Sequence, residues 1–83
     1  MTSEARVLLL YHTAGCHLCE QAEALAAPLT VERGWVLRRI DIADDEALLE
    51  RYATRIPVLR DPRGERELGW PFDAQMVLDL LAG

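Results

Sequence analysis

The chain has 83 residues, 51% apolar and 28% charged, which is enough material for one hydrophobic core and too little for two domains. Nine lysine and arginine residues against fourteen aspartate and glutamate residues leave a net charge of −5, which repels a phosphate backbone. We therefore expect one folded domain over residues 1–83 and no nucleic-acid partner.

The longest apolar run near the start, Val7–Tyr11, is shorter than the core of a signal peptide and far shorter than a membrane span. This predicts a cytoplasmic protein without membrane contact. In that reducing compartment, Cys16 and Cys19 are more often catalytic or metal-binding than a structural disulfide, because cellular thiols keep ordinary disulfides open.

The first half of the chain predicts a strand followed by a helix. Val7–Tyr11 fits a central strand that is covered on both faces. An amphipathic helix is expected to begin at the cysteines, and Pro28, which lacks an amide hydrogen, should kink or stop it near Ala27. Its expected apolar stripe is Leu18, Ala22, Leu25, Ala26 and Leu29, opposite Glu20, Gln21 and Glu23.

The middle of the chain predicts an edge strand and a short helix. Trp35–Ile42 is rich in large apolar residues, and Arg38 and Arg39 within it would protect an edge strand against unwanted pairing. Asp44 is expected to cap the short helix that follows. The residues expected to face inward on this helix are Ala47, Leu48 and Tyr52.

The last third predicts a hairpin and a closing helix. The two strands of the hairpin are expected at Ile56–Arg60 and Glu65–Trp70. Between them lies Asp61–Gly64, whose residues suit a type I turn. Asp73 can cap the last helix, with Phe72 and Val77 spaced as a hydrophobic staple. The expected buried stripe of this helix is Met76, Val77, Leu80 and Leu81. The order βαβαββα predicts the α/β thioredoxin fold, a four-stranded mixed sheet flanked by three helices.

The segment Cys16-His17-Leu18-Cys19 stands where the buried strand gives way to the amphipathic helix. At the helix start, unpaired N–H groups and the helix dipole lower the pKa of a thiol below its free value of ~8.5, so Cys16 is the expected nucleophile. Cys19 lies one turn further on and is the expected resolving cysteine, which attacks a mixed disulfide formed at Cys16.

Two histidines beside the cysteines leave other interpretations open. His12, Cys16, His17 and Cys19 offer the ligand types that zinc favours, but no second pair completes a closed site of recognisable spacing, so no metal is expected. Protonated His17 would stabilise the thiolate of Cys16, and His12 is a second candidate for this effect. Both histidines can equally be solvated polar residues.

Three segments together resemble the short bacterial glutaredoxin-like proteins of the thioredoxin superfamily: Tyr11–Cys19, Ile56–Leu59 and Gly69–Asp73. The resemblance implies that the Ile56–Pro57 bond is cis and that Pro57 faces the cysteines. We then expect the backbone of Ile56 to lie beside Cys16, free to pair with an extended substrate. Trp70 either lines the same groove or holds the last helix on the sheet.

Glutaredoxins typically carry Pro-Tyr between the cysteines and a Gly-Gly pair before the last helix, where this chain has His17-Leu18 and Gly69-Trp70. Weak glutathione binding is therefore expected, with no cofactor beyond a thiol reductant. The sequence predicts a monomeric thiol–disulfide oxidoreductase of cell redox homeostasis that acts on protein or small-molecule disulfides. The alternatives are a thioredoxin-fold binding module that responds to redox state without turnover, and a zinc site with cysteine and histidine ligands.

Overall fold

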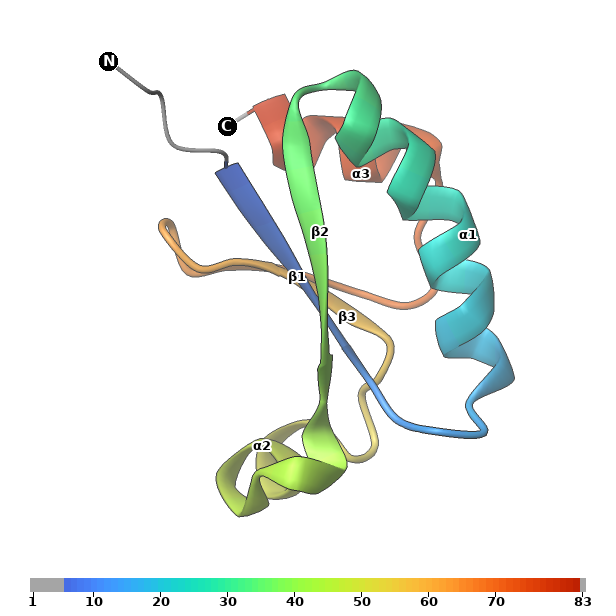
Figure 1. Ribbon diagram of the computed structural model, residues 1–83, viewed down its shortest axis with the longest axis vertical. Coiled ribbons are helices and arrows are strands. Elements are labelled where there is room, and N and C mark those ends of the chain that lie inside the picture. Colours follow the sequence, from blue (N-terminus) through green and yellow to red (C-terminus); the bar gives the residue numbers. More distant parts are fainter. Residues whose placement is uncertain (1–5, 83) are drawn as a thin grey trace.

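The computed structural model describes residues 6–82 and contains four strands and three α-helices in that range (Figure 1). These elements are β1 (Arg6–His12), α1 (His17–Glu32), β2 (Trp35–Asp41), α2 (Glu46–Tyr52), β3 (Val58–Asp61), β4 (Arg66–Gly69) and α3 (Ala74–Ala82). A single 3-10 turn, Ile42–Asp44, joins β2 to α2. The predicted order of elements is confirmed.

The four strands form one mixed sheet in the order β2-β1-β3-β4. β1 runs parallel to β2 and antiparallel to β3, and β4 returns antiparallel to β3. β1 is thus a central strand and β2 an edge strand, as the apolar run and the two arginines predicted. This sheet with its three helices is the predicted thioredoxin-like fold.

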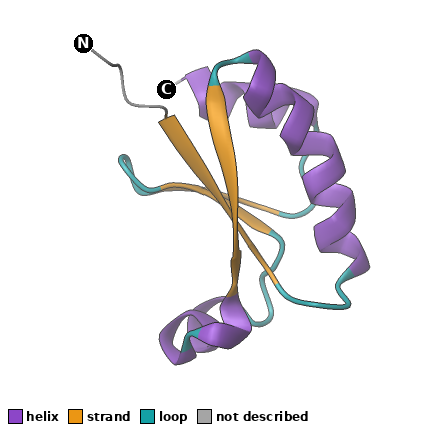
Figure 2. Ribbon diagram, in the orientation of Figure 1, coloured by secondary structure: helices purple, strands orange, loops and turns teal. Residues whose placement is uncertain are grey.

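The two faces of the sheet carry separate cores because successive side chains of a strand point to opposite faces. Leu8 and Leu10 of β1 belong to a core with residues of α1 and α3, which lie on the same side of the sheet (Figure 2). Tyr11 belongs to a second core with Tyr52 of α2, and their rings stack with centroids 4.4 Å apart.

Helix α1 continues past Pro28 to Glu32, so a stop near Ala27 is wrong. Pro28 lies on the exposed side of the helix, where water can bond the carbonyl group that lacks its helical partner. The buried stripe is Cys19, Ala22, Ala26 and Thr30. The buried stripe thus begins at Cys19 and not at the expected Leu18, which is 46% exposed.

The cap of α2 is Asp45, whose carboxylate accepts hydrogen bonds from the amides of Ala47 and Leu48. Our assignment of the cap to Asp44 is wrong because Asp44 belongs to the preceding 3-10 turn, which has its own capping aspartate, Asp41. Ala47 is exposed rather than buried, since it lies in the first turn on the solvent side.

The predicted cap of α3 is present: Asp73 accepts from the amide of Met76 at 2.9 Å, and Phe72 and Val77 are buried in one core. Met76 itself is 41% exposed, so the expected stripe is wrong at this position.

In the hairpin, β3 begins two residues later than expected, and Glu65 takes the left-handed conformation at a φ of 56°.

The buried carboxylate of Asp61 joins the hairpin to α3. It accepts a hydrogen bond from the amide of Arg63 at 3.0 Å and pairs with the guanidinium of Arg66 at 3.3 Å. Arg66 also donates to the carbonyl oxygen of Leu80 at 2.6 Å. Burial disfavours the charged carboxylate, but these bonds outweigh it and hold the pKa of Asp61 below its usual value.

Asp61→Asn should lower the free energy of unfolding by about 2 kcal/mol near neutral pH, because a buried charged hydrogen-bond acceptor is lost. The folded-state pKa of Asp61 lies below its ordinary value of 3.8, so its stabilisation is present above that pH. It is lost as the pH falls through the folded-state pKa. Urea unfolding near neutrality and in strong acid measures both effects.

The exposed Glu50→Gln is the matched control and should change stability little at either pH. A difference between wild type and Asp61→Asn that persists unchanged in strong acid would contradict the assignment to the ionised carboxylate.

Candidate functional site

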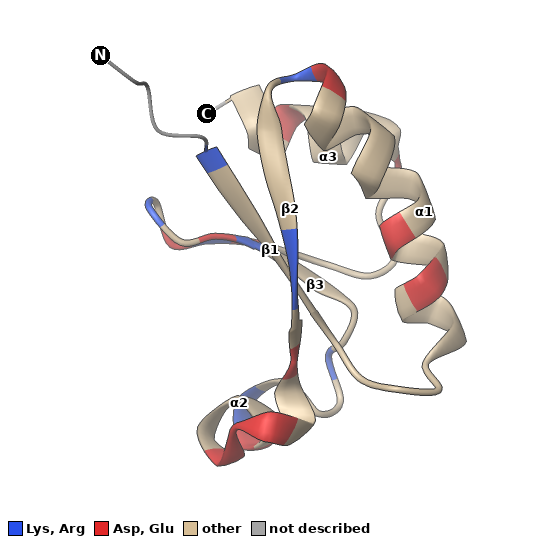
Figure 3. Cartoon of the chain, in the orientation of Figure 1, with Lys and Arg blue, Asp and Glu red and all other residues tan. Residues whose placement is uncertain are grey.

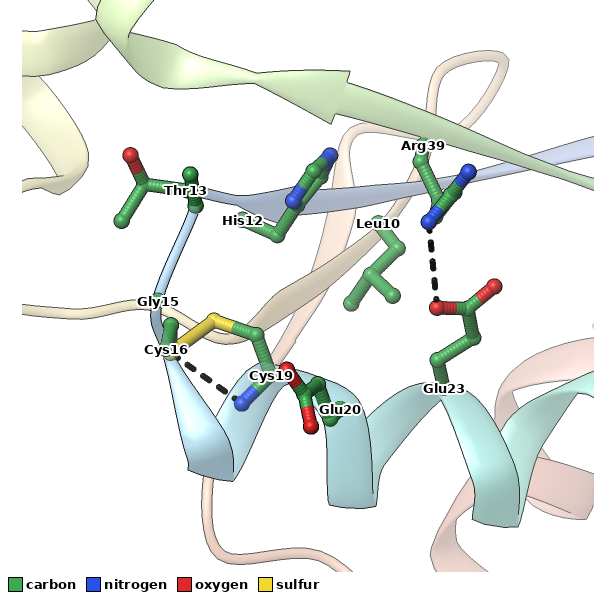
Figure 4. Close-up of a pocket in the computed structure, with 10 residues that line it drawn as sticks. Leu10, His12, Thr13, Gly15, Cys16, Cys19, Glu20, Glu23 and Arg39 are labelled. Carbon is green, nitrogen blue, oxygen red and sulfur yellow. Dashed lines mark hydrogen bonds and ion pairs between the residues drawn. A yellow bond between two sulfur atoms is a disulfide. The ribbon is translucent and has the colours of Figure 1, made fainter.

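The start of α1 is built around the sulfur of Cys16. Cys16 is the capping residue of the helix, and its Sγ accepts a hydrogen bond from the amide of Cys19 at 3.1 Å (Figure 4). The two sulfurs form a disulfide, with the Cα atoms 5.2 Å apart. A helix N-terminus favours negative charge at this position. The amide that faces the sulfur here can therefore face a thiolate after reduction.

The two cysteines differ in exposure. Cys16 is partly exposed at the end of the loop between β1 and α1. Cys19 is only 4% exposed and lies on the buried stripe of the helix. A large substrate can reach Cys16 but not Cys19. This asymmetry is the arrangement that a nucleophile and a resolving cysteine need.

A hollow of about 150 Å³ opens beside the disulfide. Its walls come from the end of β1, the loop 13–16, the first turns of α1 and Arg39 of β2. Glu23 of α1 and Arg39 form an ion pair across it, with 3.5 Å between oxygen and nitrogen (Figure 4). Figure 3 shows the basic segment of β2 opposite the acidic segments of α1.

Sequence reasoning missed Glu23 and Arg39 as members of the site. We assigned Glu23 to the outer side of the helix and Arg39 to the protection of a sheet edge. The sequence held one signal: Glu23 follows Cys19 by four residues and so shares its helix face. The register that pairs Arg39 with Leu10 of the hollow is seen only in the structure.

The two histidines lie in different places. His12, half-buried at the end of β1, lines the hollow together with both cysteines. His17 is exposed in the first turn of α1 and is not part of the lining. The structure therefore brings His12, and not His17, into the lining of the hollow.

Ile56, Pro57 and Trp70 form a second group, which does not line the hollow. The Ile56–Pro57 and Trp70–Pro71 bonds are both cis, and the amide of Trp70 donates to the carbonyl of Pro57 at 3.2 Å. The amide of Ile56 donates to the carbonyl of Tyr52 at 3.1 Å. The expected free backbone at Ile56 is therefore wrong for its N–H, and only its carbonyl is left for a substrate strand.

Tyr52 links α2 to β4 through its hydroxyl, which donates to the carboxylate of Glu67. Arg55 also pairs with Glu67, at 2.8 Å. Burial and this hydrogen bond raise the pKa of Tyr52. Burial opposes ionisation of Glu67, yet the bonds from Tyr52 and Arg55 hold the pKa of this carboxyl below its usual value.

Within residues 6–82, histidine, cysteine, aspartate and glutamate side chains form no group of three or more that could hold a metal ion. No helix in this described range has the length and apolar character needed to cross a bilayer.

Fold and site together define a class: a thioredoxin-fold protein with a Cys-x-x-Cys redox motif at the start of its first helix. A family model described as "Glutaredoxin-like domain (DUF836)" matches residues 7–82, and the chain belongs to this family. The resemblance found in the sequence is thereby confirmed.

Solved structures of similar proteins agree with this assignment. The X-ray structure of the structural-genomics target protein XcR50 from X. campestris shares 44% identity over 92% of this chain and 97% of its own, with a TM-score of 0.75. Protein Ne2328 from Nitrosomonas europaea, solved by NMR, shares 31% identity over 96% of this chain and 95% of its own, with a TM-score of 0.77. A comparison with curated proteins gives no significant match.

In the reduced protein, Cys16 should react with iodoacetamide faster than Cys19 near neutral pH, because it is the more exposed thiol and caps the helix. Its reactivity should also extend to lower pH. Alkylation of each cysteine, followed by mass spectrometry of the peptides across a pH series, measures this. Equal rates at every pH would remove the assignment of Cys16 as nucleophile.

Proposed function

We propose that the protein is a thiol–disulfide oxidoreductase that works in cell redox homeostasis in the cytoplasm. The observation that carries the proposal is the pairing of an exposed, helix-capping Cys16 with a buried Cys19 within disulfide reach. The family assignment supports it. The chain acts as a monomer and needs no cofactor beyond a thiol reductant.

The reaction uses both cysteines and balances without another oxidant. The thiolate of Cys16 attacks one sulfur of a substrate disulfide, and the first substrate thiolate leaves. The thiolate of Cys19 then attacks Cys16, so that the bond to the substrate breaks and the second substrate thiolate leaves. Two electrons pass from the cysteine pair to the substrate, and an external thiol reduces the Cys16–Cys19 disulfide for the next cycle.

Protein or other dithiol disulfides are the proposed substrates, with glutathione adducts poorer ones. Trp70 occupies the position where a second glycine would let a small ligand approach the backbone. Its half-buried ring packs edge-on against Phe72 with centroids 5.0 Å apart, which holds the ring in place. The net charge of −5 gives no general attraction for an anionic tripeptide.

With a matched reductant, turnover of a protein disulfide such as that of insulin should exceed turnover of a glutathionylated peptide. Trp70→Gly should raise the rate with the glutathionylated peptide, because the steric barrier is removed, and Trp70→Leu is the control that keeps bulk at this position. Circular dichroism checks that both variants fold. A wild-type preference for the glutathionylated peptide that Trp70→Gly leaves unchanged would contradict the steric argument.

A thioredoxin-fold binding module that senses redox state without turnover is the second candidate, since the fold alone serves both kinds of protein. Repeated cycles of disulfide reduction by catalytic amounts of the chain would exclude it. Cys19→Ser stops the reaction at the mixed disulfide, so this variant captures the partners of Cys16 covalently.

A further inference from the structure

One face of the sheet is only half covered. Helices α1 and α3 lie on the first face, while α2 lies on the second face, near the ends of β1 and β2 (Figure 1). Within residues 6–82, no helix lies over the half of the second face that is near the starts of these strands (Figure 2). We call it the open half. It consists of Val7, Leu9, Val36, Arg38, Arg60 and Glu67.

The alternation of side chains along the strands places these residues on the second face. Trp35 belongs to the core under α1 and α3, so Val36 and Arg38 cannot both belong to it, and they point to the open half. Leu9 packs against the second core, and its register partners are Arg38 on β2 and Arg60 on β3. One row across the sheet therefore places an apolar side chain between two arginines.

The open half carries positive charge that neighbouring carboxylates do not balance. Arg38 is exposed and takes part in none of the ion pairs among residues 6–82. A nitrogen of Arg60 lies 3.9 Å from the carboxylate of Glu67. That carboxylate already accepts hydrogen bonds from Tyr52 and Arg55. An acidic surface would therefore complement the open half, although the whole chain has a net charge of −5.

Helix α2 offers such an acidic surface at the other end of the same face. Leu48 packs against the second core and Tyr52 is buried, so Glu46 and Glu50 share the exposed side of the helix, one turn apart. Leu49 beside them is 42% exposed, and Val36 of the open half is 44% exposed. Figure 3 shows the acidic α2 well separated from the basic middle of β2.

We infer that the second face pairs with the same face of another copy of this chain about a two-fold axis. Helix α2 of each copy then lies over the open half of the other, and the two helices lie side by side between the two sheets. Glu50 of each copy meets Arg38 of the other. The two exposed apolar side chains, Leu49 and Val36, become covered. A two-fold axis makes each of these contacts twice.

This pair is expected to be weak. Its interface has few apolar side chains, and the net charge of −5 opposes self-association, so we expect a dissociation constant on the order of 100 µM. In dilute solution the chain is then a monomer, as the proposed function has it. The disulfide at the start of α1 lies on the other face of the sheet, so each Cys16 stays accessible in the pair (Figure 1).

Sedimentation equilibrium of the oxidised chain, from well below to well above about 100 µM, tests the pairing. The average mass should rise from that of one chain, 9.4 kDa, toward that of two. Arg38→Glu and Glu50→Arg should each keep the mass of one chain, because like charges then meet at both copies of the contact. An equimolar mixture of the two variants should associate again. In a mixed pair, one contact has its charges exchanged and the other is the wild-type contact.

Two control variants separate the contact from a general effect of charge. Arg33→Glu and Glu32→Arg make the same changes in net charge at the end of α1, on the covered face, and should associate like wild type. Circular dichroism checks that every variant folds. Amide chemical shifts of the wild type should change on dilution in α2 and the open half, and not at Cys19.

The inference is overturned if the wild type keeps the mass of one chain at the highest concentration. It is also overturned if Arg38→Glu and Glu50→Arg associate as the wild type does, if their mixture stays dissociated, or if the control variants lose association as well. The turnover of disulfides is measured in dilute solution, so its failure would contradict the proposed function and leave this result unchanged.

Discussion

The hydrogen bond from the amide of Cys19 to the sulfur of Cys16 is the contact on which the chemistry of this chain depends. It makes a cysteine serve as the cap of a helix, a position that serine, threonine, aspartate or asparagine usually occupies. A sulfur that satisfies a free amide of the first turn also feels the positive end of the 16-residue helix α1. In the reduced protein, helix formation and stabilisation of a Cys16 thiolate would therefore use the same contact.

The close packing of α1 on the sheet explains why the rest of the site assembles around this cap. Ala22 and Ala26, both fully buried, let the helix approach β1 closely, and Cys19 continues the same buried stripe. The parallel register of β1 and β2 then sets Arg39 beside Leu10, within reach of the helix face that carries Glu23. The hollow lies between this helix face, the end of β1 and the arginine of the edge strand.

Much of the fold could be predicted because its signals are local. The apolar run of β1, the capping Asp73 and the paired cysteines each define their own element through nearby residues. Two of the wrong predictions concern the length of α1 and its rotation, which tertiary packing decides. Pro28 does not end α1 because it faces solvent, and Leu18 is exposed because Cys19 takes the buried position.

The candidate site likewise contains residues that could be predicted from local signals and contacts that could not. Cys16 and Cys19 could be identified from their spacing and their place between strand and helix. The pairing of Glu23 with Arg39 joins residues sixteen positions apart and depends on the strand register, which a single sequence does not specify. The bond from the amide of Ile56 to Tyr52 depends likewise on the course of the chain after α2.

That last bond constrains how a substrate can be held. A strand added beside Ile56 would normally receive one hydrogen bond from its amide and give one to its carbonyl. Here the amide is already bonded to the backbone carbonyl of Tyr52. The Ile56 backbone can therefore offer an extended substrate a single acceptor. For the proposed protein substrate, affinity would then come largely from side-chain contacts around Cys16, and selectivity would follow the shape of that surface more than the backbone of the partner.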